Sequence, residues 1–450
     1  PPKRRRPPAA RALGALAPMV GERRGLLGMP RTEGRETARV GPDIPTAWVA
    51  MLVAVVAATG GCTGGTDLTG GRDADTPDET DADGTDVRLD TGDMVLPPTA
   101  PPVDILVLID DSNSMDQEQL GLTIWFPELL EELDHPTDSD GDGVPDHLPV
   151  TDLRVGVVTQ DTGVGGYAIS TCESNPFVGD DGCLQHEPSP GVGGCEATYQ
   201  SWLSFRAEDE ATYPVTRLAQ DFTCIGTLGG RGCGIEQPLE GLRRAVTTQS
   251  VPGGCNEGFL RPDSLLVLIV LSDEDDTSVD AAHLDMLDQE RTDLGHLNIR
   301  AFLHPEMLTP VEDFVEAFLS VRSGRTDRLV FGVIAGVPPA TPVCNRPGDE
   351  LDACLALPEM QERIDPLAPT QLMPSCNSSM GMAMPPVRLV RLAQLLGDAA
   401  WVGSVCDTDY GPAIRGITGR IVDRLGTPRM PPCSRGRSAT NGATAPSARA

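Results

Sequence analysis

The 450-residue sequence lacks the short motifs that mark several common classes of enzyme. None of its six histidines belongs to an H-E-x-x-H zinc-protease motif, and no G-x-S-x-G nucleophile elbow is present. The glycine-rich stretches 163–166 and 229–234 fit neither the dinucleotide fingerprint nor the lysine-containing phosphate loop. No nucleophile is paired with a base. We therefore expect no enzymatic activity, and a metal-assisted hydrolase is the alternative.

Positive charge is scarce beyond the first 61 residues. The formal net charge is −31 at pH 7 and the sequence pI is about 4.4. Residues 1–61 hold ten Lys and Arg and four acidic residues, a net charge of +6, which leaves −37 (−31 minus 6) for the rest. A surface this acidic repels phosphate backbones and anionic lipid. We expect no nucleic-acid partner; divalent cations, basic partners or plain solubility are the open explanations of the charge.

None of the 12 cysteines lies in a C-x-x-C pair, which disfavours a zinc ribbon. Disulfide bonds in an oxidising compartment explain so many thiols better than a reduced cytosol does. We expect Cys224 and Cys233 to close a small ring. Although spacing leaves the connectivity open, we expect the other cysteines to staple an insertion at 162–213 and to pin the Pro-rich segment 337–386 to the last strand; the first group is Cys172, Cys183 and Cys195, and the second is Cys344, Cys354, Cys376 and Cys406.

No apolar run is long enough to span a bilayer, which takes about 20 residues. Residues 47–58 form a run of 12 apolar residues with arginines upstream, as in a signal peptide. Thr59-Gly60-Gly61-Cys62 then resembles the bacterial lipobox, in which the cysteine carries the lipid, although leucine is usual where Thr59 stands. With Thr63 next, the pattern predicts an outer-membrane lipoprotein anchored in the cell envelope through Cys62. The alternative is an ordinary signal peptide cut near Ala58.

Composition divides the chain into a leader (1–62), a tether, a folded domain and a tail. Residues 1–28 are expected to precede the natural start at Met29. Residues 63–102 consist mainly of Gly, Thr, Asp and Pro, and hold too few large apolar side chains to offset the entropy of ordering. They are predicted to be a disordered acidic tether. The folded domain is expected at 103–426, with insertions at about 137–147, 162–213 and 337–386, and the disordered tail at 427–450.

Apolar runs and amphipathic stretches alternate in the folded part, which predicts a doubly wound, mostly parallel α/β sheet with helices on both faces. Residues 265–271 (LLVLIVL) are the strongest candidate for a central strand. Ligands of such sheets bind beyond the carboxyl ends of the strands. The other expected strands are 103–109, 153–158, 329–335 and 400–405, and the expected helices are 117–133 (kinked or interrupted at Pro127), 235–246, 311–321, 389–396 and 409–425.

Two of these strand ends are acidic. The first strand is followed by Asp-Asp-Ser-Asn-Ser-Met (110–115), and the central strand by Ser-Asp-Glu-Asp-Asp (272–276). Because alternate residues of a loop can direct their oxygens to one point, Asp110, Ser112 and Ser114 can share one cation. Carboxylate and hydroxyl oxygens completed by water suit Mg²⁺ or Mn²⁺. The alternative is that one of the serines caps a helix.

The D-x-S-x-S pattern after an apolar strand, with a second acidic strand end downstream, resembles the metal-ion-dependent adhesion site of the von Willebrand factor A family. Residues 110–119, 226–239, 258–261 and 271–278 look like a subgroup of such lipoproteins common in myxobacteria. The resemblance extends over about residues 103–425. It implies that Asp110, Ser112 and Ser114 bind the metal, together with Asp273.

The third part of the family's metal site is usually a threonine that opens a helix, and this sequence has another residue at that position. Counting back from Gly241-Leu242 leads to Glu236, whose carboxylate would add charge and ligand strength. Thr227 lies nearby and can supply the hydroxyl instead. Glu236 is slightly favoured, and its alternative role is to interact with a helix dipole.

The resemblance also implies a function. In the family, an open coordination position of the metal accepts a carboxylate from a partner protein. We therefore expect an envelope lipoprotein that holds a protein partner through a divalent cation. A structural domain with a degenerate metal site is a further alternative.

A second acidic loop lies at 138–146. Asp138, Asp140 and Asp142 alternate with small residues, and Asp146 follows, which resembles a calcium loop of the thrombospondin type 3 kind. Pro149 stands where an EF-hand loop has its glutamate, which disfavours an EF-hand. We expect a Ca²⁺-stabilised insertion, and a solvated acidic turn is the alternative.

Overall fold

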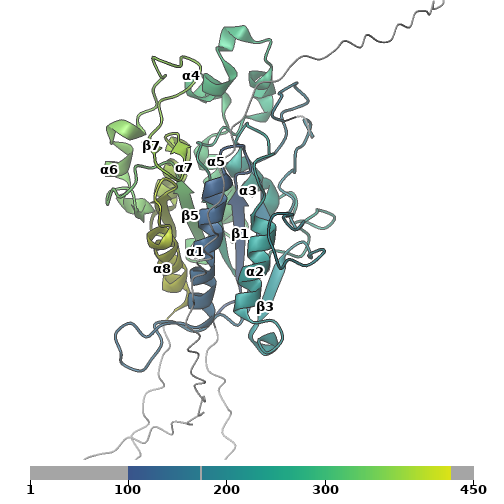
Figure 1. Cartoon of the computed structure of the whole chain (residues 1–450), viewed down its shortest axis with the longest axis vertical. Helices are drawn as coiled ribbons and strands as arrows, with labels where there is room; N and C mark the ends of the chain where they lie inside the picture. Colours follow the sequence, from purple (N-terminus) through teal and green to yellow (C-terminus); the bar gives the residue numbers. More distant parts are fainter. Residues whose placement is uncertain (1–99, 173–174, 427–450) are drawn as a thin grey trace, which may run out of the picture. The chain divides into compact units, whose positions relative to one another are not determined.

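The computed structural model describes residues 100–172 and 175–426 (Figure 1). The expected leader with its lipidated Cys62, the tail at 427–450, and the tether apart from residues 100–102 lie outside the described residues. Within the described ranges, none of the helices combines the length and apolar character needed to cross a membrane.

A seven-stranded sheet forms the centre of the fold, in the order β3-β2-β1-β4-β5-β9-β6. Its inner strands are parallel and its two edge strands run antiparallel to their neighbours, which confirms the expected mostly parallel α/β sheet. All residues of β1, β4 and β5 are buried, because helices cover both faces. The strands are β1 (Val103–Ile109), β2 (Asp152–Val158), β3 (Leu203–Arg206), β4 (Leu265–Leu271), β5 (Leu329–Ala335), β6 (Arg346–Pro347) and β9 (Ala400–Ser404).

Three helices cover each face of this sheet. On one face α1 lies between α2 and α8, as Figure 1 shows, and their apolar side chains pack on Ile105 and Ile269. On the other face α3, α5 and α7 pack on Leu106 and Leu268, because successive strand residues point to opposite faces. The helices are α1 (Asp116–Asp134), α2 (Val215–Gly226), α8 (Gly411–Leu425), α3 (Pro238–Val246), α5 (Val311–Ser320) and α7 (Val387–Leu396).

Smaller elements lie in the connections. The segment between β4 and α5 contains 3₁₀ turns and the single-turn α4 (Arg300–Leu303). The segment between β5 and α7 contains α6 (Asp352–Leu355) and a small hairpin of β7 (Cys376–Asn377) and β8 (Met382–Ala383). The predicted insertion 162–213 includes β3, so its last part belongs to the main sheet.

Helix α1 runs through Pro127 without a break, so the predicted interruption there is wrong. Proline removes one backbone hydrogen bond, but burial on both sides of it holds the helix together. Phe126 and Leu129 are fully buried, and the Phe126 ring stacks on Phe222 with 3.9 Å between centroids. The packing of this face outweighs the lost bond.

Ten cysteines of the described residues form five disulfides, and the expected Cys224–Cys233 ring is wrong. These two cysteines lie close in sequence but bond to different parts of the chain. The expected link to the last strand is present once, because Cys376 pairs with Cys406 just after β9. The other bonds are Cys172–Cys233, Cys183–Cys255, Cys195–Cys224 and Cys344–Cys354.

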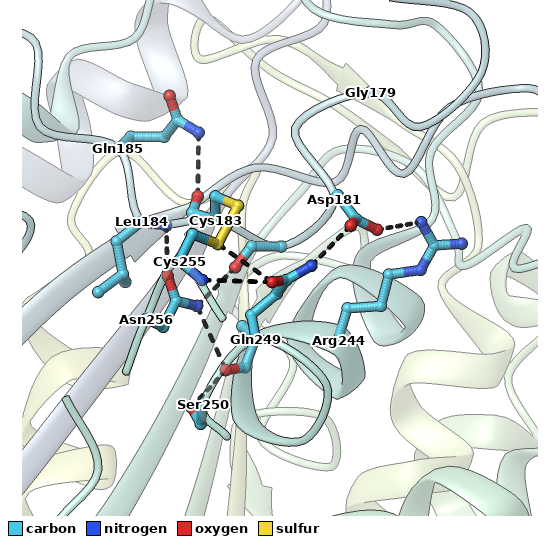
Figure 2. Close-up of a disulfide and its surroundings, with 12 residues drawn as sticks. Gly179, Asp181, Cys183, Leu184, Gln185, Arg244, Gln249, Ser250, Cys255 and Asn256 are labelled. Carbon is cyan, nitrogen blue, oxygen red and sulfur yellow. Dashed lines mark hydrogen bonds and ion pairs between the residues drawn. A yellow bond between two sulfur atoms is a disulfide. The ribbon is translucent and has the colours of Figure 1, made fainter. Parts of the chain in front are cut away.

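Figure 2 shows the surroundings of the Cys183–Cys255 bond. The Asn256 side chain accepts a hydrogen bond from the Leu184 backbone N–H at 2.9 Å and donates to the Gly182 carbonyl at 2.8 Å. Asp181 accepts from Arg244 at 2.7 Å and from Gln249 at 2.6 Å. The loop after β2 is thus tied to α3 and the turn that follows it.

The central strand is expected to dominate stability. Leu268→Ala removes a fully buried side chain from β4 and should lower the free energy of unfolding by about 3 kcal/mol, measured by urea denaturation. Leu367→Ala is the control, because Leu367 is 93% exposed, and it should leave the midpoint unchanged. Equal effects of the two substitutions would contradict the assigned core.

Candidate metal centre

The loops that follow β1 and β4 are neighbours because the two strands pair in register up to Ile109 and Leu271. The Asp110 backbone N–H donates to the Leu271 carbonyl at 3.0 Å, one residue beyond the paired strand. The acidic residues of both loops therefore begin at the same edge of the sheet.

Asp110 is fully buried, and three loops hold its carboxylate. Its Oδ1 accepts from the Ser112 backbone N–H at 2.9 Å and from Gln160 Nε2 at 3.0 Å. Its Oδ2 accepts from the Ser272 hydroxyl at 2.7 Å. These donors follow β1, β2 and β4, so the position of the carboxylate depends on the order of the strands.

The other three residues expected at the metal continue from Asp110 as a chain of oxygen contacts. The Ser112 hydroxyl contacts the Asp110 carboxylate, and Ser112 Oγ lies 3.3 Å from Ser114 Oγ. The Ser114 hydroxyl in turn contacts the Asp273 carboxylate. Asp273 is 2% exposed, and its Oδ1 has no hydrogen-bond partner. Asp110, Ser112, Ser114 and Asp273 are thus brought together.

The helix-cap alternative for the two serines is wrong. Helix α1 begins after Met115, and no side chain caps its N-terminus. Ser112 and Ser114 instead lie in the turn between β1 and the helix, where Ser112 is buried and Ser114 is exposed. Their hydroxyl groups instead lie beside the Asp110 and Asp273 carboxylates.

Glu236 lies just before α3 and is 4% exposed. Its backbone carbonyl accepts from the Thr277 N–H at 2.7 Å and from the Thr277 hydroxyl at 2.6 Å, which fixes it beside the loop after β4. Burial first, and then the charge of Glu274 beside it, raise the pKa of its carboxyl group well above the usual value. Two neighbouring buried negative charges repel each other, which favours the protonated form of such a carboxyl group.

Thr227 is placed differently. It follows α2, and its hydroxyl donates to the Thr223 carbonyl of that helix at 2.9 Å. Its loop does approach the centre, because Gly229 exchanges two hydrogen bonds with the Gln119 side chain, at 2.9 and 3.1 Å. The hydroxyl itself bonds to the helix, whereas Glu236 interacts electrostatically with Asp110.

Sequence reasoning missed several residues of this centre: Glu274, Gln160 and Ser272, together with Asp111 and Glu118, whose carboxyl groups lie near Asp110. Glu274 and Ser272 belong to the acidic run after β4, and their place beside Asp273 was the available signal. Gln160 follows β2, and it bonds both to Asp110 Oδ1 and to the Asp111 backbone N–H (3.1 Å). Nothing in its local sequence marks it.

Burial raises the pKa of every carboxyl group in this centre. For Asp273 it is raised to about 8, by burial first and then by the Asp110 charge. For Asp111 it is also raised to about 8, with the same two leading causes, and burial raises the pKa of Glu118 to about 7. Burial likewise raises the pKa values of Asp110, Glu236 and Glu274.

No lysine or arginine of the described residues forms a salt bridge with these six carboxyl groups; the salt bridges present lie elsewhere. Asp104, near the other end of β1, provides a comparison for Asp110, which follows the strand. Asp104 is also fully buried, but Arg261 Nε donates to its Oδ1 at 2.8 Å. At the amino end of β1 the buried carboxylate is therefore paired with an arginine. The carboxyl groups at the other end have no basic partner, and their negative charge can be neutralised only by protons or by a cation.

Within the described residues, no three carboxyl groups around Asp110 bring their oxygens within 4.8 Å of one another. Among the described residues, sets of three acidic or histidine ligand atoms within 4.8 Å of one another occur at Asp138, Asp140 and Asp142, and at Asp134, His135 and Glu210. An ion beside Asp110 would therefore take few direct carboxylates and would rely on hydroxyls and water. Mg²⁺ accepts such a ligand set, since it keeps several waters when bound to proteins.

The expected calcium loop does bring three aspartates together, and all three are exposed. Asp138 accepts from the Gly141 and Gly143 backbone N–H groups, each at 2.8 Å. Both glycines have positive φ, 74° and 84°, which closes the loop around the carboxylates. Asp146 is outside this set and instead accepts from the Ser139 N–H at 3.3 Å.

Comparisons with known proteins leave the family open. No family model and no curated protein matches the chain. Proximal thread matrix protein 1 of the mussel byssus is 12% identical over 53% of this chain and 38% of that chain, with a TM-score of 0.20. The pilus adhesin RrgA of Streptococcus pneumoniae is 15% identical over 39% and 21%, with a TM-score of 0.17. Both TM-scores are too low to bear on fold or function.

The raised pKa values predict an unusual pH dependence of stability without metal. Unfolded Asp and Glu titrate near pH 4, whereas Asp111 and Asp273 have pKa values of about 8. The folded chain therefore holds more protons than the unfolded chain between these values. The stability that these two groups contribute is fully present below about pH 4 and is lost as the pH rises toward 8.

The measurement is the Tm in a chelator from pH 5 to pH 8, where we expect a decrease. Mg²⁺ should raise the Tm at pH 8 more than at pH 5, because it replaces the protons. NaCl of equal ionic strength is the control. A Tm that is independent of pH and Mg²⁺ would count against a cation site here.

Proposed function

We propose that residues 103–426 form a von Willebrand factor A-type domain that binds one Mg²⁺ or Mn²⁺ through Asp110, Ser112 and Ser114, together with Asp273. The observation that carries this proposal is the group of buried carboxylates without a basic partner. Three of their oxygens have no hydrogen-bond partner: Asp111 Oδ1, Glu118 Oε2 and Asp273 Oδ1. A divalent cation would stabilise the ionised forms, since it is the largest local charge in such a site.

Glu236 is the favoured third element of the site. It is buried, and it lies close enough to Asp110 for the two charges to raise its pKa further. A cation near Asp110 would favour the ionised form of Glu236. Thr227 is the less favoured alternative because its hydroxyl is bonded to α2.

The bound cation would act as a docking point for a protein. Asn113 and Ser114 are exposed, so the turn that carries the expected ligands reaches the surface. A carboxylate of the partner can then complete the coordination sphere. Catalysis is not part of the proposal, because the centre holds no nucleophile activated by a base.

We further propose that the protein works in the cell envelope, anchored by lipid at Cys62. The five disulfides of the described residues support an oxidising compartment. The acidic chain favours a partner that it meets through a metal ion or through basic groups.

Isothermal titration with Mn²⁺ and Mg²⁺ tests the ion site. Asp110→Asn should weaken binding by about tenfold or more, because it removes the charge at the centre of the ligand set. Asp116→Asn removes the same charge from an exposed position nearby and should bind as the unchanged protein does. Equal binding by Asp110→Asn would reject the site.

The same pair of variants tests adhesion. Envelope proteins retained by the immobilised chain in Mg²⁺ should be released by a chelator and should not be retained by Asp110→Asn. Retention that ignores both the chelator and the substitution would reject the metal-bridged carboxylate. Hydrolysis of a substrate panel that disappears with Asp110→Asn would instead establish the hydrolase alternative.

The loop at 138–146 is proposed to bind Ca²⁺ independently. Asp140→Asn should weaken Ca²⁺ binding more than Asp146→Asn, because only Asp140 belongs to the convergent set. Calorimetric titration in Mg²⁺-containing buffer separates this loop from the other centre, and Asp110→Asn should leave the Ca²⁺ affinity unchanged. Equal losses for Asp140→Asn and Asp146→Asn would contradict the assigned ligand set.

A further inference from the structure

A cavity of about 480 Å³ lies beyond the carboxyl end of β4, beside the candidate metal centre. The acidic run after β4, the segment between β4 and α5, and the segment before α7 form its walls. Its volume falls within the range of pockets that hold small organic ligands, about 300–1,000 Å³. Much of its lining is apolar: Met286, Leu297, Phe302, Leu308, Leu372 and Met384.

The two arginines of the cavity are already occupied. The Arg300 guanidinium donates to backbone carbonyls, among them those of Met286 and Asp288, each at 2.6 Å. Arg388 forms an ion pair with Asp276 at 2.9 Å and also donates to the Thr309 carbonyl at 2.6 Å. The donors of both guanidinium groups are therefore engaged, and the charge of Arg388 is also paired with a carboxylate.

The carboxylates of the cavity divide into two groups. Asp275 accepts from the Arg388 and Leu389 backbone N–H groups at the start of α7, and Asp276 is paired with Arg388. Glu236, Glu274 and Glu362 also line the cavity, and none of them forms a salt bridge within the described part of the chain. The unmatched charge of the cavity is therefore negative.

The burial of Glu236 makes the unmatched negative charge of the cavity energetically unfavourable. It is 4% exposed, it lies beside Glu274, and no basic side chain of the described residues forms a salt bridge with it. Glu362 is partly buried in a different segment, and burial raises its pKa while Arg388 lowers it. A positively charged group stabilises buried carboxylates of this kind. An apolar body on the same ligand would fill the rest of the cavity.

We propose that this cavity binds a small organic cation, with an apolar body against the leucine and methionine side chains and one ammonium group among Glu236, Glu274 and Glu362. The site goes beyond the proposed adhesion function and does not require the metal ion. It is nevertheless adjacent to the metal centre, because Glu236 and Glu274 belong to both. An ammonium group and a divalent cation would then compete for Glu236, and each would weaken the other's binding by the same factor.

Calorimetric titration with three probes of similar shape tests the charge preference. 2-Phenylethylamine carries a positive charge at neutral pH, 2-phenylethanol none, and phenylacetate a negative one. In a chelator, the amine should bind at least about tenfold more tightly than the alcohol, as expected for a charged hydrogen bond in a partly buried site. Phenylacetate should not bind. Equal affinities for amine and alcohol, or no binding of the amine at millimolar concentration, would overturn the proposal.

Matched variants locate the binding. Glu362→Gln should weaken the amine about tenfold and leave the alcohol unchanged, whereas Glu359→Gln, an exposed residue of the same segment outside the lining, should change neither. Ala301→Trp fills the cavity and should abolish binding of both probes. Unchanged amine binding in Glu362→Gln and Ala301→Trp would reject the cavity as the site.

The metal variant keeps this test separate from the proposed function. Asp110→Asn should still bind the amine, whether or not the unchanged protein binds Mn²⁺. If Mn²⁺ binds, its apparent affinity should fall as the amine saturates the cavity. Loss of amine binding in Asp110→Asn would contradict an independent site, and failure of Mn²⁺ binding alone would reject only the adhesion proposal.

Discussion

The in-register pairing of β1 with β4 is the constraint on which the rest of the site depends. Both strands are fully buried and end together, at Ile109 and Leu271. Asp110 directly follows β1, and Asp273 lies two residues beyond the end of β4, so their carboxyl groups meet at one edge of the sheet. Hydrogen bonds to Gln160 and Ser272 then hold Asp110 in a single position. A shift of one residue in register would exchange the faces of β4 and move Asp273 away.

Charge compensation distinguishes the two ends of β1. At the amino end, Arg261 and Ser264 bond to Asp104. At the carboxyl end, Asp110 is surrounded by acidic groups, and no basic residue of the described ranges forms a salt bridge with it. A stably folded domain rarely leaves a buried charge without compensation. The metal proposal and the amine proposal both follow from this imbalance, one for the turn after β1 and one for the cavity beyond β4.

The disulfides act mainly on the long connections of the fold. Cys172–Cys233 and Cys183–Cys255 tie the segment after β2 to the region on either side of α3, and Cys376–Cys406 ties the segment before α7 to the end of β9. Such bonds limit the disorder of the unfolded chain and so favour the folded state. They also hold the walls of the candidate sites, because Glu236 follows Cys233 and the hairpin of Cys376 precedes Met384.

Local patterns in the sequence determined the core of this fold and the position of its acidic edge. Buried parallel strands are continuous apolar runs, so β1 and β4 were predictable from seven residues each. The D-x-S-x-S pattern marked Asp110, Ser112 and Ser114 as candidate ligands, because alternate residues of a loop can direct their oxygens to one point. What depended on distant residues was decided only by the tertiary structure. The bonding of Cys224 to Cys195, the continuity of α1 through Pro127, the Glu236–Glu274 contact and the bond from Thr227 to α2 each join or bury groups whose neighbours in space are not their neighbours in the chain.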